Sequence, residues 1–176
     1  MSAATPAVRP LVVLVGPMGA GKTTVGRMLA QTAGVGFRDT DADVEARAGK
    51  PVSEIFVDDG EAAFRELERD AVVTALAEHD GVLALGGGAV MTPAIRDALA
   101  GHRVVFLQVG LTDAVKRVGM GTGRPLLLGN VRARVKQLLD ERTPVYESVA
   151  THVVDTDGRD AADVAASVRE LLEEKR

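Results

Sequence analysis

The chain has 176 residues, of which 46% are hydrophobic and 26% are charged. This length can bury one core and would be cramped as two domains, so we expect a single domain over residues 1–176. The net charge is −4 and the basic residues are scattered, which argues against a nucleic-acid partner. The absence of cysteine excludes disulfides, thiolate metal sites and cysteine nucleophiles, and it fits the reducing cytoplasm, where we expect the protein to reside.

The beginning of the chain has no pattern of a signal peptide or membrane anchor. Residues 1–9 contain Ala, Thr and Pro with a single Arg, and we expect them to form a disordered tail. The apolar run that follows, residues 11–15, is too short to span a bilayer, which takes about 20 residues. We therefore expect no membrane partner.

Short apolar runs rich in β-branched residues alternate with segments whose apolar residues recur every three or four positions. This alternation predicts an α/β fold with a five-stranded parallel sheet and helices on both faces. The predicted strands are residues 11–15, 36–38, 82–85, 104–109 and 152–154.

Several helix starts carry capping residues. Thr92 precedes Pro93, Thr112 precedes an aspartate, and Asp160 precedes the alanine-rich final segment. Residues 118–130 interrupt the helical pattern with four glycines, one proline and three consecutive leucines. We expect this segment to be a mobile lid on an otherwise compact domain.

Residues 16–23 read Gly-Pro-Met-Gly-Ala-Gly-Lys-Thr, between a predicted strand and a predicted helix. This spacing is typical of a P-loop, in which backbone amides at a helix N-terminus converge on phosphate oxygens. Lys22 would span the β- and γ-phosphates, and the Thr23 hydroxyl would ligate magnesium. The alternative is a plain glycine turn before a helix.

The strand over residues 82–85 runs into Gly86, Gly87 and Gly88 without an aspartate. Hydrolytic and mechanical P-loop proteins usually place a magnesium-supporting aspartate at the end of such a strand. An Asn-Lys-x-Asp segment that would read guanine is also missing from the sequence. Both observations favour a small kinase, whose metal takes its carboxylate support from another place.

Asp39 and Asp41 follow the second predicted strand. Ligands of an open parallel sheet bind beyond the carboxyl ends of its strands, so both side chains should face the cleft that holds the P-loop. Asp39 could support the magnesium shell through water, and Asp41 could accept a hydroxyl proton and aim the oxygen at the γ-phosphorus. The alternative is that they are solvated turn carboxylates or a helix cap.

The predicted helix over residues 60–78 carries Glu68 on its apolar stripe. A carboxylate facing the core needs a partner, and Arg65 lies within reach at i−3. The pair could be a plain helix ion pair. The other interpretation is that Glu68 orients Arg65, whose planar guanidinium binds a substrate carboxylate.

Gly86, Gly87 and Gly88 end a buried strand just before a capped helix. Glycines in this place let backbone amides approach a ligand closely. They could also serve only as a tight strand-to-helix turn.

The ordered set of these motifs resembles the shikimate kinase family over nearly all of residues 11–174. The matching elements are Gly-Pro-Met-Gly-Ala-Gly-Lys-Thr-Thr-Val-Gly from residue 16, Asp39-Thr40-Asp41, the run from Ile55-Phe56 through Gly60-Glu61 and Phe64-Arg65 to Glu68, the triple glycine, Arg124-Pro125-Leu126, and Arg142 through Tyr146. The resemblance implies a P-loop kinase fold and magnesium-dependent transfer of the γ-phosphoryl group of ATP to the 3-hydroxyl of shikimate, with ATP and shikimate as partners of a monomer.

The resemblance also implies roles for individual residues. Lys22, Asp41 and Arg124 are the implied catalytic residues, with Arg124 on the lid, and Thr23 and Asp39 are the implied Mg²⁺ residues. The implied ATP contacts are Gly19, Ala20, Gly21, Lys22, Thr23, Thr24, Arg117, Arg124 and Arg159. The implied shikimate contacts are Asp41, Arg65, Glu68, Gly86, Gly87, Gly88 and Arg142.

Three of the arginines have other interpretations. Arg124 and Arg159 could be solvated loop residues, and Arg142, which precedes Thr143-Pro144 at an expected helix end, could cap backbone carbonyls. The competing functions are gluconate kinase, nucleoside monophosphate kinase, and a nucleotide-binding module that phosphorylates no metabolite.

Overall fold

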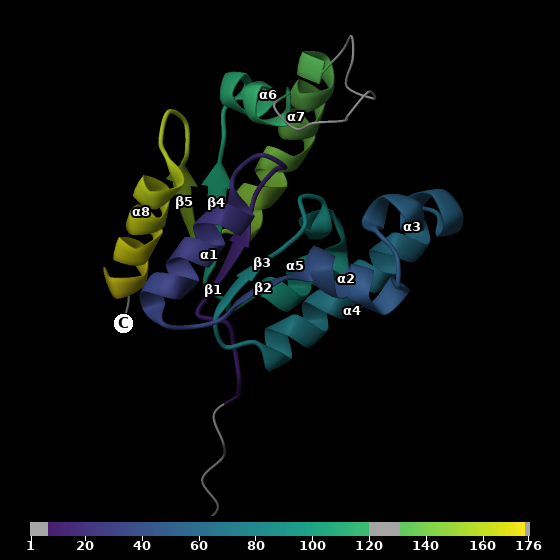
Figure 1. Ribbon diagram of the computed structural model, residues 1–176, viewed down its shortest axis with the longest axis horizontal. Helices are drawn as coiled ribbons and strands as arrows, with labels where there is room; N and C mark the ends of the chain where they lie inside the picture. The colour runs from purple at the N-terminus through teal and green to yellow at the C-terminus, as the bar shows by residue number, and fades with distance from the viewer. Residues whose placement is uncertain (1–6, 120–130, 175–176) are drawn as a thin grey trace, which may run out of the picture.

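A five-stranded parallel sheet forms the centre of the protein in the computed structural model, which describes residues 7–119 and 131–174 (Figure 1). The strand order is β2-β3-β1-β4-β5. All neighbouring strands run parallel, as the alternation of strands and helices predicts. The strands are β1 (Val12–Val15), β2 (Phe37–Asp39), β3 (Val82–Ala84), β4 (Val104–Gln108) and β5 (His152–Asp155).

Strand β1 lies between β3 and β4, with Leu14 paired to Ala84 on one side and to Val105 on the other. The chain order therefore reverses around β1, and such a switch point opens a crevice at the carboxyl ends of the strands. The segment after β1 is the predicted phosphate loop. Residues that follow β2 and β3 lie at the same edge, since Asp39 pairs with Ala84.

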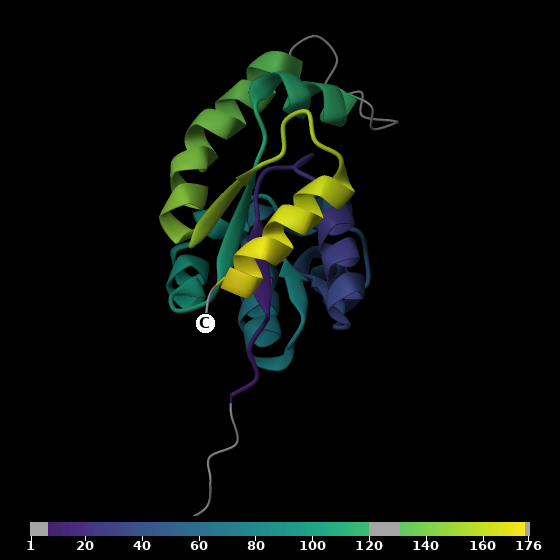
Figure 2. The same cartoon turned by 90° about the vertical axis from the view of Figure 1, so that its left-hand side faces the viewer.

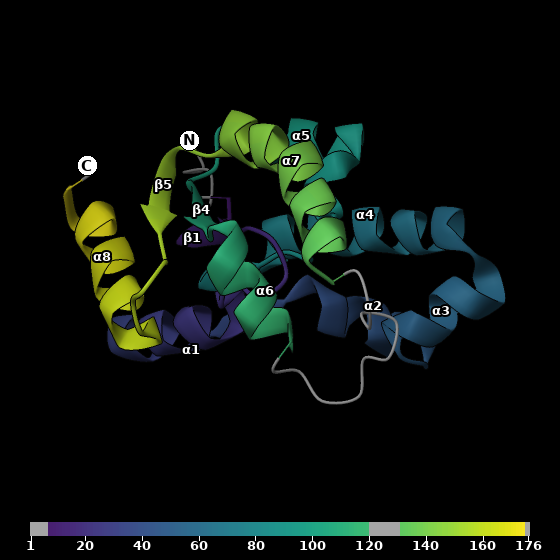
Figure 3. The same cartoon turned by 90° about the horizontal axis from the view of Figure 1, so that it is seen from above.

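Helices cover both faces of the sheet (Figures 2 and 3). Their bounds are α1 (Lys22–Ala33), α2 (Thr40–Ala48), α3 (Val52–Asp59), α4 (Glu61–Glu78), the 3-10 turn η1 (Ala89–Met91), α5 (Pro93–Leu99), α6 (Leu111–Gly119), α7 (Val131–Val149) and α8 (Ala161–Glu174).

Alternate residues along each buried strand point to opposite faces and build two separate cores. Leu14 and Leu107 lie in the core that includes residues of α1 and α8. Val15 and Phe106 lie in the core that includes residues of α4, α5 and α7. This separation follows from the period of two in a strand, and strands buried on both sides account for the continuous apolar runs in the sequence.

Helices α2, α3 and the N-terminal part of α4 extend beyond the β2 edge of the sheet (Figure 1), and a third, smaller core lies between them. It consists of Val44 from α2, Ile55 from α3, and Phe64 and Ala71 from α4. Because α2 and α3 pack on the N-terminal part of α4, they form one wall of the cleft above the sheet. Glu45 strengthens this corner, since its carboxylate accepts a 2.9 Å hydrogen bond from the Val52 amide at the start of α3.

Two local predictions were wrong. Helix α6 begins at Leu111, so Thr112 lies inside the helix instead of capping it. Helix α7 continues through Pro144 to Val149, so Arg142 is in mid-helix and not at a helix end. Proline removes one helical hydrogen bond, but burial of Tyr146 in the core next to it keeps this part of the helix in place.

Other local predictions are confirmed. Asp160 accepts a 2.8 Å hydrogen bond from the Asp163 amide and caps α8. Thr92 precedes α5 as its N-cap residue, although its side chain makes no capping hydrogen bond. No helix among the described residues is long and apolar enough to cross a bilayer. Residues 118 and 119 of the predicted lid belong to α6. Arg124 and the rest of the predicted lid, residues 120–130, lie outside the described residues, as do residues 1–6 of the predicted tail.

Candidate active site

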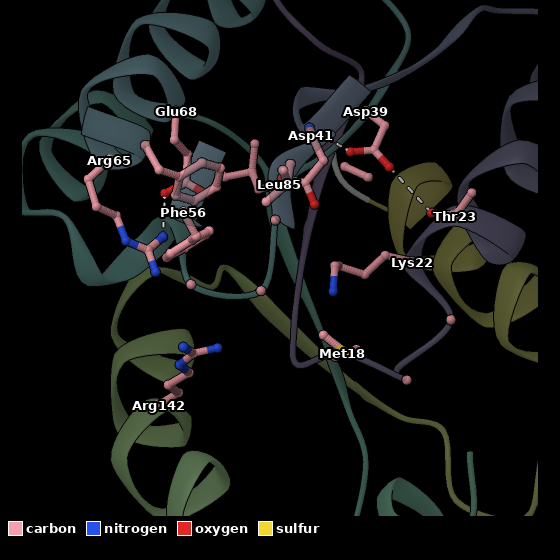
Figure 4. Close-up of a pocket in the computed structure, with 18 of the residues that line it drawn as sticks. Met18, Lys22, Thr23, Asp39, Asp41, Phe56, Arg65, Glu68, Leu85 and Arg142 are labelled. Atoms are coloured by element: carbon pink, nitrogen blue, oxygen red, sulfur yellow. Dashed lines mark hydrogen bonds and ion pairs between the residues drawn. The ribbon is translucent and has the colours of Figure 1, made fainter. Parts of the chain in front are cut away.

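The predicted phosphate loop joins β1 to the N-terminus of α1 (Figure 4). Gly16 must be glycine, because a Cβ there would lie 2.6 Å from the Leu107 carbonyl oxygen. Gly21 ends the loop with a φ of 90°, which only glycine adopts easily, and α1 begins at the next residue. The first amides of α1 thus open toward the cleft, as anion binding at a helix N-terminus requires.

Lys22 reaches back across this loop. Its Nζ donates hydrogen bonds of 2.6 Å to the Gly16 carbonyl oxygen and 3.0 Å to the Pro17 carbonyl oxygen. Burial lowers the pKa of Lys22 to about 8, against the opposing effect of the Asp41 and Asp39 charges. The ammonium group therefore lies inside the loop that the sequence predicts to hold phosphates.

Asp39 ends β2 and caps α2. Its Oδ1 accepts a 2.9 Å hydrogen bond from the Asp41 amide, and its Oδ2 lies 3.4 Å from the Thr23 hydroxyl, which donates to it. A hydroxyl beside a carboxylate suits Mg²⁺, which prefers oxygen ligands and usually takes one or two carboxylates plus water and phosphate oxygens. No cluster of three or more metal-ligating side chains occurs among the described residues, so Thr23 and Asp39 would share the ion with phosphate and water.

Asp41 faces the same cleft from the first turn of α2. The two aspartates share this cleft because the chain changes from strand to helix between them. Burial raises the pKa of Asp41, the Asp39 charge adds to the effect, and Lys22 opposes it. A carboxylate with a raised pKa is a better proton acceptor for a hydroxyl than an ordinary surface aspartate.

The predicted pair on α4 is formed. Arg65 Nη1 lies 2.6 Å from Glu68 Oε1, and the Glu68 side chain is only 1% exposed. Burial raises the pKa of Glu68, while the Arg65 charge lowers it. The guanidinium also lies 5.2 Å from the centroid of the Phe64 ring. Glu68 and Phe64 together hold Arg65 at the cleft.

Arg142 reaches the cleft from α7, on the side that faces Arg65 (Figure 4). The triple glycine runs between the two arginines. A Cβ on Gly87 would lie 3.7 Å from Arg142 Nη1, and one on Gly88 would lie 2.7 Å from Arg65 Nη2. A Cβ on Gly86 would meet the Asp41 carboxylate at 2.6 Å. A Cβ at position 86 or 88 would therefore collide with these side chains, whereas one at position 87 would make ordinary contacts.

All of these groups line one cavity of about 460 Å³. The cavity brings together Lys22, Thr23, Asp39, Asp41, Arg65, Glu68, Gly86, Gly87, Gly88 and Arg142 from the predicted set. Its lining also includes apolar residues for which the sequence predicts no site role, namely Met18, Val52, Phe56, Phe64, Ala84 and Leu85. The centroids of the Phe56 and Phe64 rings are 4.6 Å apart. Phe56 is on α3 and Phe64 is on α4, so the helical periodicity of the sequence could not predict that the two rings meet.

A smaller cavity of about 200 Å³ opens on the other side of the phosphate loop and is lined by Gly19, Ala20, Gly21, Thr24, Arg117 and Arg159, among others. Arg117 donates to the Gly19 carbonyl oxygen at 3.0 Å and to the Thr156 carbonyl oxygen at 2.9 Å. It therefore ties the phosphate loop to the β5–α8 connection. Arg159 bonds the Asp163 carboxylate at 2.9 Å on α8.

Comparison with known proteins identifies the family. The family model described as shikimate kinase matches residues 18–173. The shikimate kinase of Salinispora arenicola is 62% identical over 93% of this chain and 98% of its own, and that of Streptomyces coelicolor is 54% identical over 94% and 97%.

Solved structures give the same answer. Shikimate kinase from Acinetobacter baumannii in complex with shikimate superposes with a TM-score of 0.87 at 35% identity, covering 95% of this chain and 94% of that one. A gluconokinase from Sinorhizobium meliloti reaches a TM-score of 0.58 at 21% identity, which shows a shared fold alone. From the sequence matches and this structural likeness together, the chain belongs to the shikimate kinase family.

Proposed function

We propose that the larger cavity binds shikimate beside the phosphates of ATP and transfers the γ-phosphoryl group to the 3-hydroxyl of shikimate. The observation that carries this proposal is the arrangement of one cavity, with a phosphate loop and Lys22 at one end and two arginines at the other. The proton acceptor Asp41 lies between them. A hydroxylated acid fits this order of groups, because its carboxylate needs cations and its hydroxyl needs a base.

Transfer moves a phosphoryl group between two oxygens. The substrate oxygen forms a bond to the γ-phosphorus while the bond from phosphorus to the β,γ-bridging oxygen breaks, so that ADP leaves. The hydroxyl proton passes to Asp41. Lys22 stabilises the charge that develops on the phosphoryl oxygens, because its ammonium already lies inside the loop.

We propose that Mg²⁺ accompanies ATP and is held by the Thr23 hydroxyl and, through water, by Asp39. When bound, the ion neutralises charge on the β- and γ-phosphate oxygens. Asp39 has a second role here, since the same carboxylate fixes the Asp41 amide.

Arg65 and Arg142 are proposed to bind the substrate carboxylate, with the amides of the glycine run close to it. The smaller cavity is proposed to take the adenine, with Arg117 and Arg159 in its lining. Arg124 and the lid over residues 118–130 remain predictions, as do a single domain, a monomeric state and the cytoplasmic location.

Release of ADP, coupled to NADH oxidation, tests the proposal. With ATP and Mg²⁺, shikimate should stimulate ADP release strongly, whereas gluconate, nucleoside monophosphates and buffer alone should not. Phosphorus NMR of the product should show a phosphate monoester on the 3-oxygen. If gluconate stimulates and shikimate does not, the acceptor assignment is wrong; if ATP binds and none of the acceptors stimulates, the protein is a nucleotide-binding module.

A further inference from the structure

The sole tyrosine of the chain, Tyr146, is fully buried on α7, one helical turn after Arg142. Its ring packs against that of Phe106 on β4, with 5.0 Å between the ring centroids, in the core below the glycine run. It is not among the residues that line the substrate cavity. A phenol in a core needs a partner for its hydroxyl, because an unpaired buried hydroxyl is costly.

That partner is in the active site. Tyr146 Oη donates a 2.5 Å hydrogen bond to the Gly87 carbonyl oxygen. Burial raises the pKa of Tyr146 to about 12, so the phenol keeps its proton and acts as the donor at every physiological pH. The bond joins α7 to the middle residue of the glycine run, 59 positions earlier in the chain.

Gly87 lies beside both the phosphate loop and Arg142. A Cβ placed on it would be 3.5 Å from the Met18 amide nitrogen of the phosphate loop and 3.7 Å from Arg142 Nη1. The neighbouring glycines lie against Asp41 and Arg65. A peptide is planar, so fixing the Gly87 carbonyl group also fixes the direction of the Gly88 N–H group.

The Gly86 and Gly88 carbonyl oxygens accept 3.1 Å backbone hydrogen bonds from the Ala89 and Met91 amides, and the Tyr146 hydroxyl holds the carbonyl group between them. Glycine has the largest backbone freedom of any residue, so the orientation of this middle peptide depends on the bond from Tyr146. The loop has three glycines in a row and would lose much entropy on ordering around a substrate. A hydrogen bond from a rigid, buried ring removes that freedom before the substrate arrives. Arg142 and Tyr146 are both on α7, so the hydrogen bond from Tyr146 to Gly87 also sets the distance between Arg142 and Gly87.

We propose that Tyr146 is a positioning residue for the acceptor site, which orients the Gly87–Gly88 peptide and sets the spacing between Gly87 and Arg142. It acts through these groups and does not touch the substrate. The inference rests on the proposed function, in which the acceptor carboxylate binds between Arg65 and Arg142. It predicts that the Tyr146 hydroxyl serves shikimate binding and not ATP binding.

Tyr146→Phe tests this, because it keeps the ring against Phe106 and removes only the hydroxyl. We expect the KM for shikimate to rise about tenfold, the scale of one hydrogen bond. The KM for ATP should stay within about twofold. A role limited to stability would change neither constant at a temperature well below melting.

Val168→Ala is the matched control, because Val168 is fully buried in the opposite core, on α8. Both variants should melt a few degrees below the wild type, and only Tyr146→Phe should change the KM for shikimate. An unchanged KM for shikimate in Tyr146→Phe, or an equal rise of both KM values, overturns the inference. A wild type without shikimate-dependent ADP release would instead overturn the proposed function.

A second measurement needs no variant. The chain has one tyrosine and no tryptophan, so a carbon-13 label on tyrosine gives one NMR signal, that of Tyr146. Shikimate should shift this signal, with half of the full shift reached at the concentration that half-saturates binding, whereas ADP alone should shift it less. A signal that stays in place through saturation with shikimate overturns the inference, even if Tyr146→Phe does not fold.

Discussion

Gly88→Ala should damage shikimate binding by displacing one side chain. The new Cβ would lie 2.7 Å from Arg65 Nη2 and 3.0 Å from Nη1. An ordinary contact needs about 3.5 Å, so the guanidinium has to move by about 0.8 Å. The end of an arginine side chain can move, so we expect the variant to fold. Arg65 is held at 2.6 Å by Glu68, however, and the shift stretches that bond.

The size of the effect follows from this bond. A hydrogen bond between charged groups contributes about 1.5–3 kcal/mol. The Arg65 side chain is 23% exposed, so solvent screening favours the lower end of that range. A loss of about 1.5 kcal/mol corresponds to about a tenfold rise in the KM for shikimate.

The assay is ADP release at saturating ATP with shikimate varied, and then the reverse. The KM for ATP should not change, because Arg65 is at the other end of the cavity from the phosphate loop (Figure 4). Gly36→Ala is the control, since its Cβ would meet only His79 Cε1, at an ordinary 3.5 Å. In an Arg65→Ala background, Gly88→Ala should have no further effect. The same loss in both backgrounds, or no loss in either, would refute the reasoning.

Three further substitutions test the other roles. Lys22→Ala should lower kcat about a hundredfold or more, since one preorganised electrostatic contact contributes about 3 kcal/mol; kcat close to that of the wild type would remove Lys22 from the chemistry. Asp39→Ala should raise the Mg²⁺ concentration that half-saturates activity, and an unchanged Mg²⁺ titration would exclude Asp39 from the metal site. Asp41→Asn should abolish turnover yet resist urea better than the wild type at pH 7. Burial raises the pKa of Asp41 in the folded protein, so its ionisation costs stability above that pKa and nothing below the unfolded value of about 3.9. The greater urea resistance of Asp41→Asn should therefore disappear near pH 3. If it persists there, the ionisation of buried Asp41 is not its cause.

Local chemistry was enough to predict the sheet and the donor half of the site. Buried parallel strands are continuous apolar runs, and all five runs became strands whose boundaries differ from the prediction by at most one residue. The phosphate loop is a contiguous segment whose function depends on its own backbone, so its spacing identifies it. Arg65 and Glu68 are three residues apart on one helix, and helical geometry alone brings them together.

The acceptor half depended on contacts that no local pattern encodes. Arg142 was expected at a helix end because proline usually stops a helix, but core packing of Tyr146 carries α7 past Pro144. The need for glycine at position 88 comes from Arg65 on another element. The bond between Tyr146 and Gly87 spans 59 residues and exists because α7 packs against η1 and β4. Sequence therefore determined the segments that act alone, and tertiary packing decided the distances between segments, on which the acceptor site depends.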